Sequence, residues 1–417
     1  MAAPLTVLLV TDSFPPGSGG SGWSTFELAR QLQLRGHRVS VVHASAGDAT
    51  GIEETTYEQM PVTRYRIRVP NVPAVRNVLK NERLWARLTE MLVTRGRTAP
   101  IDLIHAQHVM TTVPSVRAGR QLVVPVVATV RDYWPVCYWS DLIINDKAPG
   151  LCPACTVGNM MTCSRNRAGA LGPLAWGLIP YMRRNLGTKR TALAEADATI
   201  GVSSVITADL LARAPELDAS RVTTIPNPVN MADLEASDRP TGEPFVLFAG
   251  KLATNKGVQF LLPALDDAKI DWPLVVVGDG PLRASLEADA TRRGRVVRWM
   301  GWRSRSEVLD LMRGATMLAF PSYGPESLSR VLIEASALGL PIAAMNTGGT
   351  RDILTHNVTG LVADTREGFA KDLARLAGDP LLRRQLGTAA AAHVREKFEA
   401  SQVAARVEAV YRGVLSR

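Results

Sequence analysis

The chain alternates between short apolar runs and amphipathic stretches, and this order limits the folds open to it. Residues 6–11 read as a buried strand, a loop rich in Gly, Pro and Ser follows, and a helix is expected over 23–36 before a second strand at 37–44. A strand, a helix and a second strand in this order predict a parallel βαβ unit. Further apolar strand segments lie at 101–107, 123–130, 198–206 and 221–227.

The same alternation restarts after a polar stretch at 228–243, which contains Pro and Gly and is typical of a linker. At 417 residues the chain is also too long for one hydrophobic core. We therefore predict an α/β protein with two doubly wound domains, residues 1–232 and 240–395. A terminal helix is expected at 396–417.

The first predicted domain is basic. Residues 64–190 hold 19 Lys and Arg against 6 Asp and Glu, in a chain of net charge +9. Such an excess favours an anionic partner or else forms a solvated basic face. Aromatic residues make up only 6% of the chain and no nucleic-acid-binding motif is present, so we do not expect a nucleic-acid partner. We predict peripheral contact with an anionic membrane through 64–97 and 165–190, and the second segment reads equally well as a core helix.

No stretch indicates export or a membrane span. The N-terminal residues lack the basic flank of a signal peptide, and uncharged, apolar-biased runs such as 168–182 hold about 15 residues, fewer than the roughly 20 that a span needs. We expect a cytoplasmic protein, with peripheral attachment to the inner face of the plasma membrane as a further expectation from the basic segments.

All four cysteines of the chain fall within 27 residues, in the spacing C-x14-C-x2-C-x7-C. A C-x2-C pair with two further cysteines predicts a tetrahedral structural zinc site, and an Fe–S cluster accepts the same ligands. A coincidental group of buried thiols is the alternative. The cluster lies in an insertion at about 131–190 between two predicted strands, and its members are Cys137, Cys152, Cys155 and Cys163.

The loop GSGGSG at 17–22 matches a dinucleotide fingerprint, G-x-G-x-x-G, only weakly. The acidic residue that would bind a ribose at the end of the second strand is missing, because His43 and its neighbours stand there. A nicotinamide or flavin site is therefore not expected. The glycines still allow a ligand to approach the backbone closely.

Two glutamates eight residues apart, Glu326 and Glu334, are the strongest functional signal. The first lies on a loop at a predicted helix N-terminus, where free amides favour an anion, and the second lies on that helix. Lys251 and Lys256 bracket the loop after another predicted strand and suit a diphosphate. This combination suits a ligand with phosphates at one end and sugar hydroxyls at the other, although either lysine alone reads as a surface residue.

Two histidines close the predicted strand at 101–107. His105 and His108, with Asp132 in the next loop, could serve a sugar hydroxyl or a phosphate, or could simply pack in the core. No D-x-D motif occurs in the chain, so a catalytic divalent metal is not expected.

Taken together, these stretches resemble the retaining, nucleotide-sugar-dependent glycosyltransferases of family 4, which have the GT-B fold. The motif PSYGPESLSRVLIEASALGLPIAAMNTGG carries the family's E-x7-E region, and IPNPV, GKLATNKG and VVVGDG occur in the expected order. The resemblance implies two Rossmann-like domains facing a central cleft, with the acceptor on the first domain. It also implies that the terminal helix crosses back onto that domain.

The resemblance further implies residue roles. Glu334 would hold the ribose of a UDP-, GDP- or ADP-sugar, Glu326 would contact the donor sugar, and Lys251 and Lys256 would neutralise the leaving diphosphate. The amides from Ser327 through Leu328 and Ser329 to Arg330 would bind phosphates. Further donor contacts are expected from Gly19, Gly20, Gly250 and Gly278.

Three departures from the family pattern concern acceptor chemistry. Gln107 replaces the second histidine of a His-x-His pair, Arg131 precedes Asp132 where the family has a histidine, and Asp352 replaces a glutamate. We predict a retaining glycosyltransferase of glycan, lipopolysaccharide or glycolipid synthesis that acts on a glycan or lipid-linked acceptor. The alternatives are a GT-B epimerase or phosphorylase, or a non-catalytic nucleotide-sugar-binding subunit.

Overall fold

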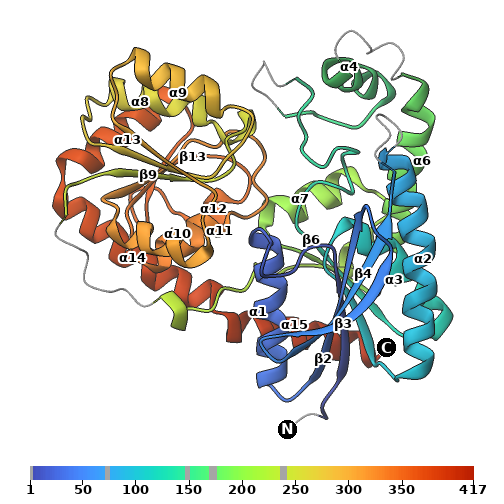
Figure 1. The fold of residues 1–417 in the computed structure, drawn as a ribbon. Coiled ribbons are helices and arrows are strands. Elements are labelled where there is room, and N and C mark those ends of the chain that lie inside the picture. Colours follow the sequence, from blue (N-terminus) through green and yellow to red (C-terminus); the bar gives the residue numbers. More distant parts are fainter. Residues whose placement is uncertain (1–2, 71–75, 146–150, 169–175, 235–241) are drawn as a thin grey trace. The chain divides into compact units, whose positions relative to one another are not determined.

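The computed structural model describes residues 3–70, 76–145, 151–168, 176–234 and 242–417. The chain divides into two compact units (Figure 1). Unit 1 contains residues 1–144, 152–228 and 400–417, and unit 2 contains 145–151 and 229–399. The terminal stretch from Ala400 thus returns to unit 1.

Unit 1 is built on an eight-stranded sheet in the order β3-β4-β2-β1-β5-β6-β7-β8. All neighbouring strands are parallel except β3 and β4, which form an antiparallel hairpin. The strands are β1 Thr6–Thr11, β2 Arg38–Gly47, β3 Gly51–Tyr57, β4 Met60–Arg68, β5 Leu103–Ala106, β6 Val126–Val130, β7 Ala198–Gly201 and β8 Val222–Thr224.

Helices cover both faces of this sheet, as the apolar central strands require (Figure 1). The helix α15 packs with α1 around a core that includes Leu9, Leu32 and Tyr411. The described helices of unit 1 are α1 Gly20–Leu34, α2 Arg76–Thr98, α3 Val109–Leu122, α4 Val157–Ala168, α6 Ile179–Ala194, α7 Ser204–Arg213 and α15 Ala400–Leu415.

Unit 2 has a six-stranded sheet in the order β11-β10-β9-β12-β13-β14, and all its recorded strand pairs are parallel. Its strands are β9 Val246–Ala249, β10 Leu274–Val277, β11 Val297–Gly301, β12 Met317–Phe320, β13 Ile342–Met345 and β14 Leu361–Ala363. Its helices are α8 Leu261–Asp267, α9 Arg283–Arg292, α10 Arg305–Gly314, α11 Arg330–Ala337, α12 Thr350–Ile353, α13 Arg366–Gly378 and α14 Pro380–Phe398.

The predicted α/β fold with two parallel-sheet domains is confirmed, with one addition. The hairpin of β3 and β4 was not predicted from the sequence, because β3 is exposed along most of its length and lacks an apolar face. Cross-strand polar contacts, including the ion pair of Glu53 with Arg66, connect it to β4 instead.

The described part of the chain contains no helix that is both long enough and apolar enough to cross a membrane. In the basic segment 64–97, the apolar side chains of α2 are used inside unit 1, where Leu84, Trp85, Leu88 and Leu92 are buried. In the segment 165–190, residues 169–175 lie outside the described part, and Ile179, Met182 and Leu186 of α6 are buried in a small core with Met160. Most described apolar residues of both segments therefore pack as core, whereas Trp176 is 38% exposed.

Candidate active site

The candidate donor site of unit 2 lies where the loops after β9 and β12 meet. These two strands are neighbours at the middle of the sheet. From β9 the chain continues to β10 on one side, and from β12 it continues to β13 on the other side. Ligands of parallel sheets bind at such a reversal, beyond the carboxyl ends of the strands. Lys251 and Lys256 follow β9, and Glu326 follows β12. The topology therefore brings together residues that lie 70 positions apart in the sequence.

Lys256 and Glu326 form an ion pair across these loops. The ammonium group of Lys256 donates to Oε1 of Glu326, and the hydroxyl of Ser322 lies 2.9 Å from the same oxygen. The side chain of Glu326 is only 12% exposed. The carboxylate is thus held by two donors from two loops, which fixes its position before any ligand arrives.

The backbone around Glu326 fits tightly, and two glycines make this fit possible. Gly257 has a φ of +66°, and a Cβ atom there would lie 1.9 Å from the carbonyl oxygen of Pro321. Gly348 has a φ of +47°, and a Cβ atom there would lie 1.8 Å from the carbonyl oxygen of Glu326. The amide of Gly349 donates to that same carbonyl at 2.8 Å. Only glycine tolerates both the dihedral angles and the close approach.

Glu334 has cationic partners of its own. It lies in the second turn of α11, where its side chain is 7% exposed, and its Oε1 accepts at 2.9 Å from Nε of Arg330 and at 2.9 Å from Nε of Arg305. Arg305 begins α10, and no sequence motif connects it with Glu334. The two glutamates thus lie on α11 and the loop before it, but they form ion pairs with different cations.

The N-terminus of α11 follows Glu326 directly. Ser329 is the N-cap, and its hydroxyl accepts from the amide of Leu332 at 3.4 Å. Within the described chain, the amides of Ser327 and Leu328 have no recorded hydrogen bond to another group. Amides at a helix N-terminus, next to a fixed carboxylate, can bind phosphate oxygens.

The remaining predicted donor residues of unit 2 lie at neighbouring strand ends. Lys251 is exposed and forms no ion pair with any residue that the structure describes. Gly278, with a φ of +123°, approaches the backbone of Gly250 so closely that a Cβ atom would lie 2.0 Å from its carbonyl oxygen. Gly278 therefore holds the ends of β9 and β10 together, a structural need that exists without any ligand.

In unit 1 the predicted glycines lie at the start of a helix. Gly19 is the N-cap of α1 and Gly20 is its first residue, and both are exposed. A Cβ atom at Gly19 would meet nothing within 4 Å. These two positions are open to a ligand, and the structure gives no packing reason for glycine at Gly19.

His105 is placed in the core and not on an open surface. It is fully buried in β5, its Nδ1 lies 2.6 Å from the hydroxyl of Tyr411, and its Nε2 lies 2.7 Å from the hydroxyl of Thr129. Burial, together with the charge of Arg131, lowers the pKa of His105 to about 3. Both ring nitrogens are engaged, so the placement agrees with the packing alternative.

His108 and Asp132, in contrast, share the carboxyl edge of the sheet with an aspartate that sequence reasoning missed. Nδ1 of His108 lies 3.3 Å from Oδ1 of Asp12, at the ends of the neighbouring strands β5 and β1. These strands flank the reversal point of the unit 1 sheet, where ligands bind. Burial raises the pKa of Asp132, and the charge of His108 opposes that shift. The signal for Asp12 was its position directly after the first strand.

A buried lysine stands next to this group. Lys189 of α6 is 4% exposed, and no ion pair to it is recorded among the described residues. Burial lowers its pKa to about 8, and the charge of Asp132 opposes the shift. Its ammonium group lies 5.5 Å from the centre of the Tyr138 ring. Sequence reasoning missed Lys189 because nothing in a helix sequence marks one lysine among several as buried.

The departures from the family pattern at Gln107 and Arg131 are in direct contact. The guanidinium group of Arg131 donates to the side-chain oxygens of Gln107 and Asn227. Arg131 is 6% exposed, and Gln107 is fully buried. Asn227 belongs to the IPNPV stretch. The two replacements therefore form one polar group beneath the strand ends.

The four cysteines converge on one small cavity. All four are free thiols, and they line a common space with a largely apolar wall. Burial raises the pKa of Cys152 and Cys163, and it raises that of Cys155 to about 11. Within the part of the chain that the structure describes, no three His, Cys, Asp or Glu side chains are arranged to hold a metal ion. The predicted zinc or Fe–S cluster is therefore not shown.

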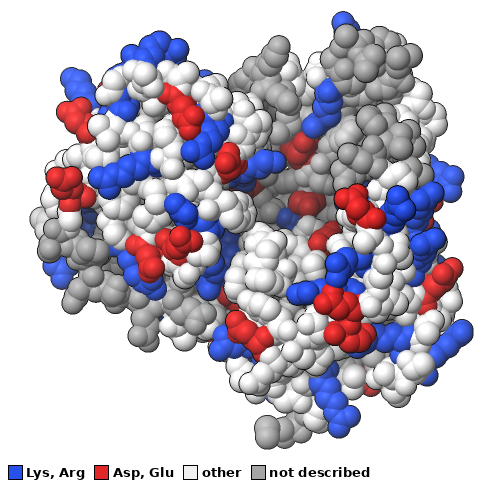
Figure 2. All heavy atoms as spheres, viewed as in Figure 1, with Lys and Arg blue, Asp and Glu red and all other residues white. Residues whose placement is uncertain are grey.

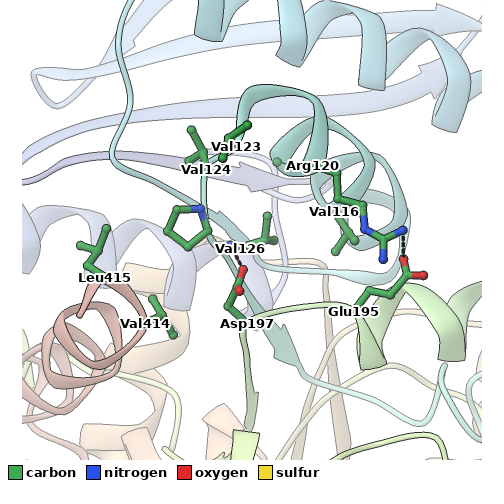
Figure 3. Close-up of a pocket in the computed structure, with 11 residues that line it drawn as sticks. Val116, Arg120, Val123, Val124, Val126, Glu195, Asp197, Val414 and Leu415 are labelled. Atoms are coloured by element: carbon green, nitrogen blue, oxygen red, sulfur yellow. Dashed lines mark hydrogen bonds and ion pairs between the residues drawn. The ribbon is translucent and has the colours of Figure 1, made fainter. Parts of the chain in front are cut away.

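A larger pocket of about 380 Å³ lies in unit 1 at the amino end of β6, away from these strand ends (Figure 3). An ion pair of 2.9 Å between Arg120 and Glu195 borders it, and Asp197 accepts from the amide of Val126 at 2.8 Å. None of the residues predicted from motifs lines it. We assign no substrate to it, because ligands of parallel sheets bind at the carboxyl ends of strands.

Sequence comparison defines the class. The profile described as Glycosyltransferase Family 4 matches residues 18–233, about half of the chain. The profile described as Glycosyl transferases group 1 matches residues 231–393. The protein belongs to glycosyltransferase family 4.

Its relatives with assigned functions are glycosyltransferases. A D-rhamnosyltransferase of Pseudomonas aeruginosa is 33% identical over 164 residues, which are 38% of this chain and 42% of that protein. An alpha-maltose-1-phosphate synthase of Mycolicibacterium smegmatis is 26% identical over 309 residues, 63% of this chain and 80% of that protein. The match thus spans less than half of the rhamnosyltransferase.

Solved structures share the fold over almost the whole chain. The sucrose-phosphate synthase of Thermosynechococcus elongatus superposes with a TM-score of 0.73 at 19% identity, covering 99% of both chains. An Anabaena protein solved in complex with UDP has a TM-score of 0.69 at 18% identity, covering 98% of this chain and 100% of the other. The fold is that of the GT-B glycosyltransferases.

Proposed function

We propose that the protein transfers a sugar from a nucleotide-diphosphate sugar to an acceptor hydroxyl, with retention of configuration. The observation that carries this proposal is the ion pair of Lys256 and Glu326 at the reversal point of the unit 2 sheet. It combines a fixed carboxylate for sugar hydroxyls with cationic groups and helix amides for a diphosphate. The UDP bound in the Anabaena protein with the same fold supports this class of donor.

The chemistry needs mainly the stabilisation of charge. As the bond between the sugar and the diphosphate breaks, negative charge grows on the leaving phosphate. Lys251, Lys256 and the amides of Ser327 and Leu328 are suited to stabilise it, because their donors are already in position. The leaving phosphate can itself take the proton of the incoming hydroxyl on the same face, which retains configuration without a protein nucleophile.

The contacts within unit 2 support the following roles in the donor site. Glu326 holds donor sugar hydroxyls through the carboxylate that Lys256 and Ser322 fix. Glu334 binds the ribose while Arg305 and Arg330 compensate its charge. Among the predicted histidines, we leave His105 out of the chemistry because both of its ring nitrogens are engaged in the core.

We propose a glycan or lipid-linked acceptor, bound on unit 1 at Asp12, His108 and Asp132. Contact with an anionic membrane, and with it attachment to the inner face of the plasma membrane, would rest mainly on basic side chains and the exposed Trp176, because most described apolar residues of 64–97 and 165–190 are core. Figure 2 shows basic and acidic side chains interspersed on the visible face. We therefore expect weak, salt-sensitive attachment to anionic vesicles.

The donor assignment is tested by nucleotide release from a panel of UDP-, GDP- and ADP-sugars. We expect release from one member of the panel, and a large loss in Glu326→Ala and Lys256→Ala. Lys371→Ala is the matched control, because Lys371 is exposed on α13 and outside both loops. Release that survives unchanged in both site variants would refute the assignment.

A further inference from the structure

Between β6 and α4, the described residues of unit 1, 131–144 and 152–156, contain neither helix nor strand. This segment nevertheless buries large side chains, Trp134 and Leu142 among them. A hydrogen bond of 2.7 Å from the amide of Cys152 to the carbonyl of Leu142 connects its two arms. Irregular segments with little core of their own commonly need a covalent or metal crosslink to hold one conformation.

The four cysteines of the chain meet in this segment. Cys137 follows a turn, Cys152 and Cys155 lie before α4, and Cys163 lies within α4, yet all four line the same enclosed cavity. Its free volume is about 10 Å³. That is about the room of one water-sized sphere, and the other lining residues are mostly apolar, so a water molecule would find few partners there. A space of this size between four thiols suits a single ion.

Cations surround the same cavity. Arg213 donates to the carbonyl oxygen of Cys152 at 3.0 Å, and the charge of Arg167 acts on the thiol of Cys163. Lys189 is buried, and its ammonium group lies 5.5 Å from the ring centre of Tyr138, the neighbour of Cys137 in the chain. Arg167 and Arg213 also form ion pairs with Asp141 and Asp209. No ion pair to the buried Lys189 is recorded among the described residues, and a zinc ion with four thiolates, of net charge minus two, would compensate its charge.

We propose that Cys137, Cys152, Cys155 and Cys163 bind one structural zinc ion, with Lys189 as its buried counter-cation. Binding replaces the four thiol protons by Zn²⁺ and releases them to solvent, without any change of oxidation state. The side chains turn inward from their present positions to reach the zinc–sulfur distance of about 2.3 Å. Because four protein ligands leave no open position, the ion has no part in the transfer reaction. Its effect on that reaction is indirect, since Lys189 also interacts with Asp132.

The test is the metal content of the full chain, purified without chelator from zinc-supplemented medium. We expect one zinc per chain, thiols that react with a thiol reagent only as zinc is released, and loss of zinc in the double variant Cys152→Ser, Cys155→Ser. Met160→Leu, at the wall of the same cavity, should keep its zinc. Four freely reacting thiols without metal, or two disulfides, would refute the site, and iron with acid-labile sulfide would refute zinc.

Lys189 is tested by zinc affinity. Lys189→Met should weaken zinc binding by about tenfold in competition with a chromogenic chelator, whereas Arg183→Met, an exposed change of equal charge on the same helix, should not. Equal affinity in both variants would refute the counter-cation role. If the cysteine variants fail to fold, zinc stoichiometry and thiol-coupled release in the unmodified chain still decide the site. Neither measurement uses a donor or acceptor, so the outcome is independent of the proposed transferase activity.

Discussion

The guanidinium group of Arg131 donates to the side-chain oxygen of Gln107, and both residues are buried beneath the carboxyl ends of β6 and β5. At these two positions the sequence departs from the family pattern, and the structure shows that the departures are coupled. An arginine keeps its charge at every relevant pH, so this pair cannot exchange protons with a substrate. The pair instead holds the buried polar side chains beneath the unit 1 site in place.

Removing this arginine should destabilise unit 1. Arg131→Met leaves the side-chain oxygens of Gln107 and Asn227 buried without their donor, and we expect a loss of about 2–4 kcal/mol in the free energy of unfolding. Urea denaturation followed by circular dichroism measures it. Arg117→Met, an exposed change on α3, should stay within about 0.5 kcal/mol of the unmodified protein. Equal effects of the two substitutions would contradict the structural role of Arg131.

His105 should make the stability of unit 1 depend on pH. Its pKa is lowered from 6.5 to about 3 in the folded protein, so below pH 6.5 the unfolded chain binds more protons than the folded one. Stability is therefore complete above about pH 6.5 and decreases as the pH falls toward 3. Between pH 7 and pH 5 the loss should be about 2 kcal/mol. In His105→Gln this part of the pH dependence should disappear, and an unchanged pH profile would contradict the assignment.

The ion pair of Lys256 and Glu326 should be needed for turnover more than for folding. Lys256→Met removes a cation from the leaving diphosphate, and we expect kcat to fall by about 10²- to 10³-fold. Glu326→Gln keeps the shape of the side chain but removes its charge, and we expect kcat to fall by a similar factor. Thermal stability should change less than activity, because Lys256 is 30% exposed and Ser322 still donates to Glu326 after the lysine is removed. A drop in melting temperature that explains the lost activity would refute a catalytic role.

Gly348 offers a test of how tightly Glu326 is positioned. Gly348→Ala places a methyl group 1.8 Å from the carbonyl oxygen of Glu326 and must displace that loop. We expect at least a tenfold loss of activity and a stability cost of about 1–3 kcal/mol. Gly294→Ala is the matched control, since Gly294 also has a positive φ, +63°, but has nothing within 4 Å of the added atom. Gly294→Ala should lose stability only because alanine disfavours a positive φ, and it should keep its activity.

At the unit 1 site, Asp12 and His108 should affect the acceptor and not the donor. We expect Asp12→Asn and His108→Gln to lower transfer to the acceptor by about 10- to 10³-fold while binding of the nucleotide alone is unchanged. Calorimetric titration with nucleotide and a transfer assay separate the two effects. Asp102→Asn is the control. Asp102 directly precedes β5, at the amino ends of the strands, and its carboxylate accepts from the amide of Thr6. Loss of nucleotide binding in the site variants would contradict this division.

Much of the fold follows from the sequence because the central strands are continuous apolar runs, which parallel sheets covered on both faces require. The strands β1, β9 and β12 are examples. The edge strand β3 has no such run, since Glu53 and Glu54 face solvent and are held by Arg66 and Thr63 of the neighbouring strand. A strand held by charged and polar side chains shows no alternation of apolar and polar residues, so the sequence does not predict it.

The candidate site was predictable where a motif is continuous and not where it is assembled from distant segments. Glu326 and Glu334 lie in one motif, whereas their cationic partners Lys256 and Arg305 lie 70 and 29 positions away. Spacing also could not distinguish His105 from His108. The difference depends on the hydroxyl of Tyr411, which lies 306 positions further along the chain.

The return of α15 to unit 1 brings both ends of the chain into one core, which contains Leu5 and Val414. Arg412 donates to the carbonyl of Ala3 at 2.5 Å. A short peptide between the ends would close the polypeptide into a ring, and the ring could be reopened between Glu399 and Ala400. In that circular permutant, apart from residues 145–151, each unit would be encoded without interruption. The two halves could then be produced as separate polypeptides.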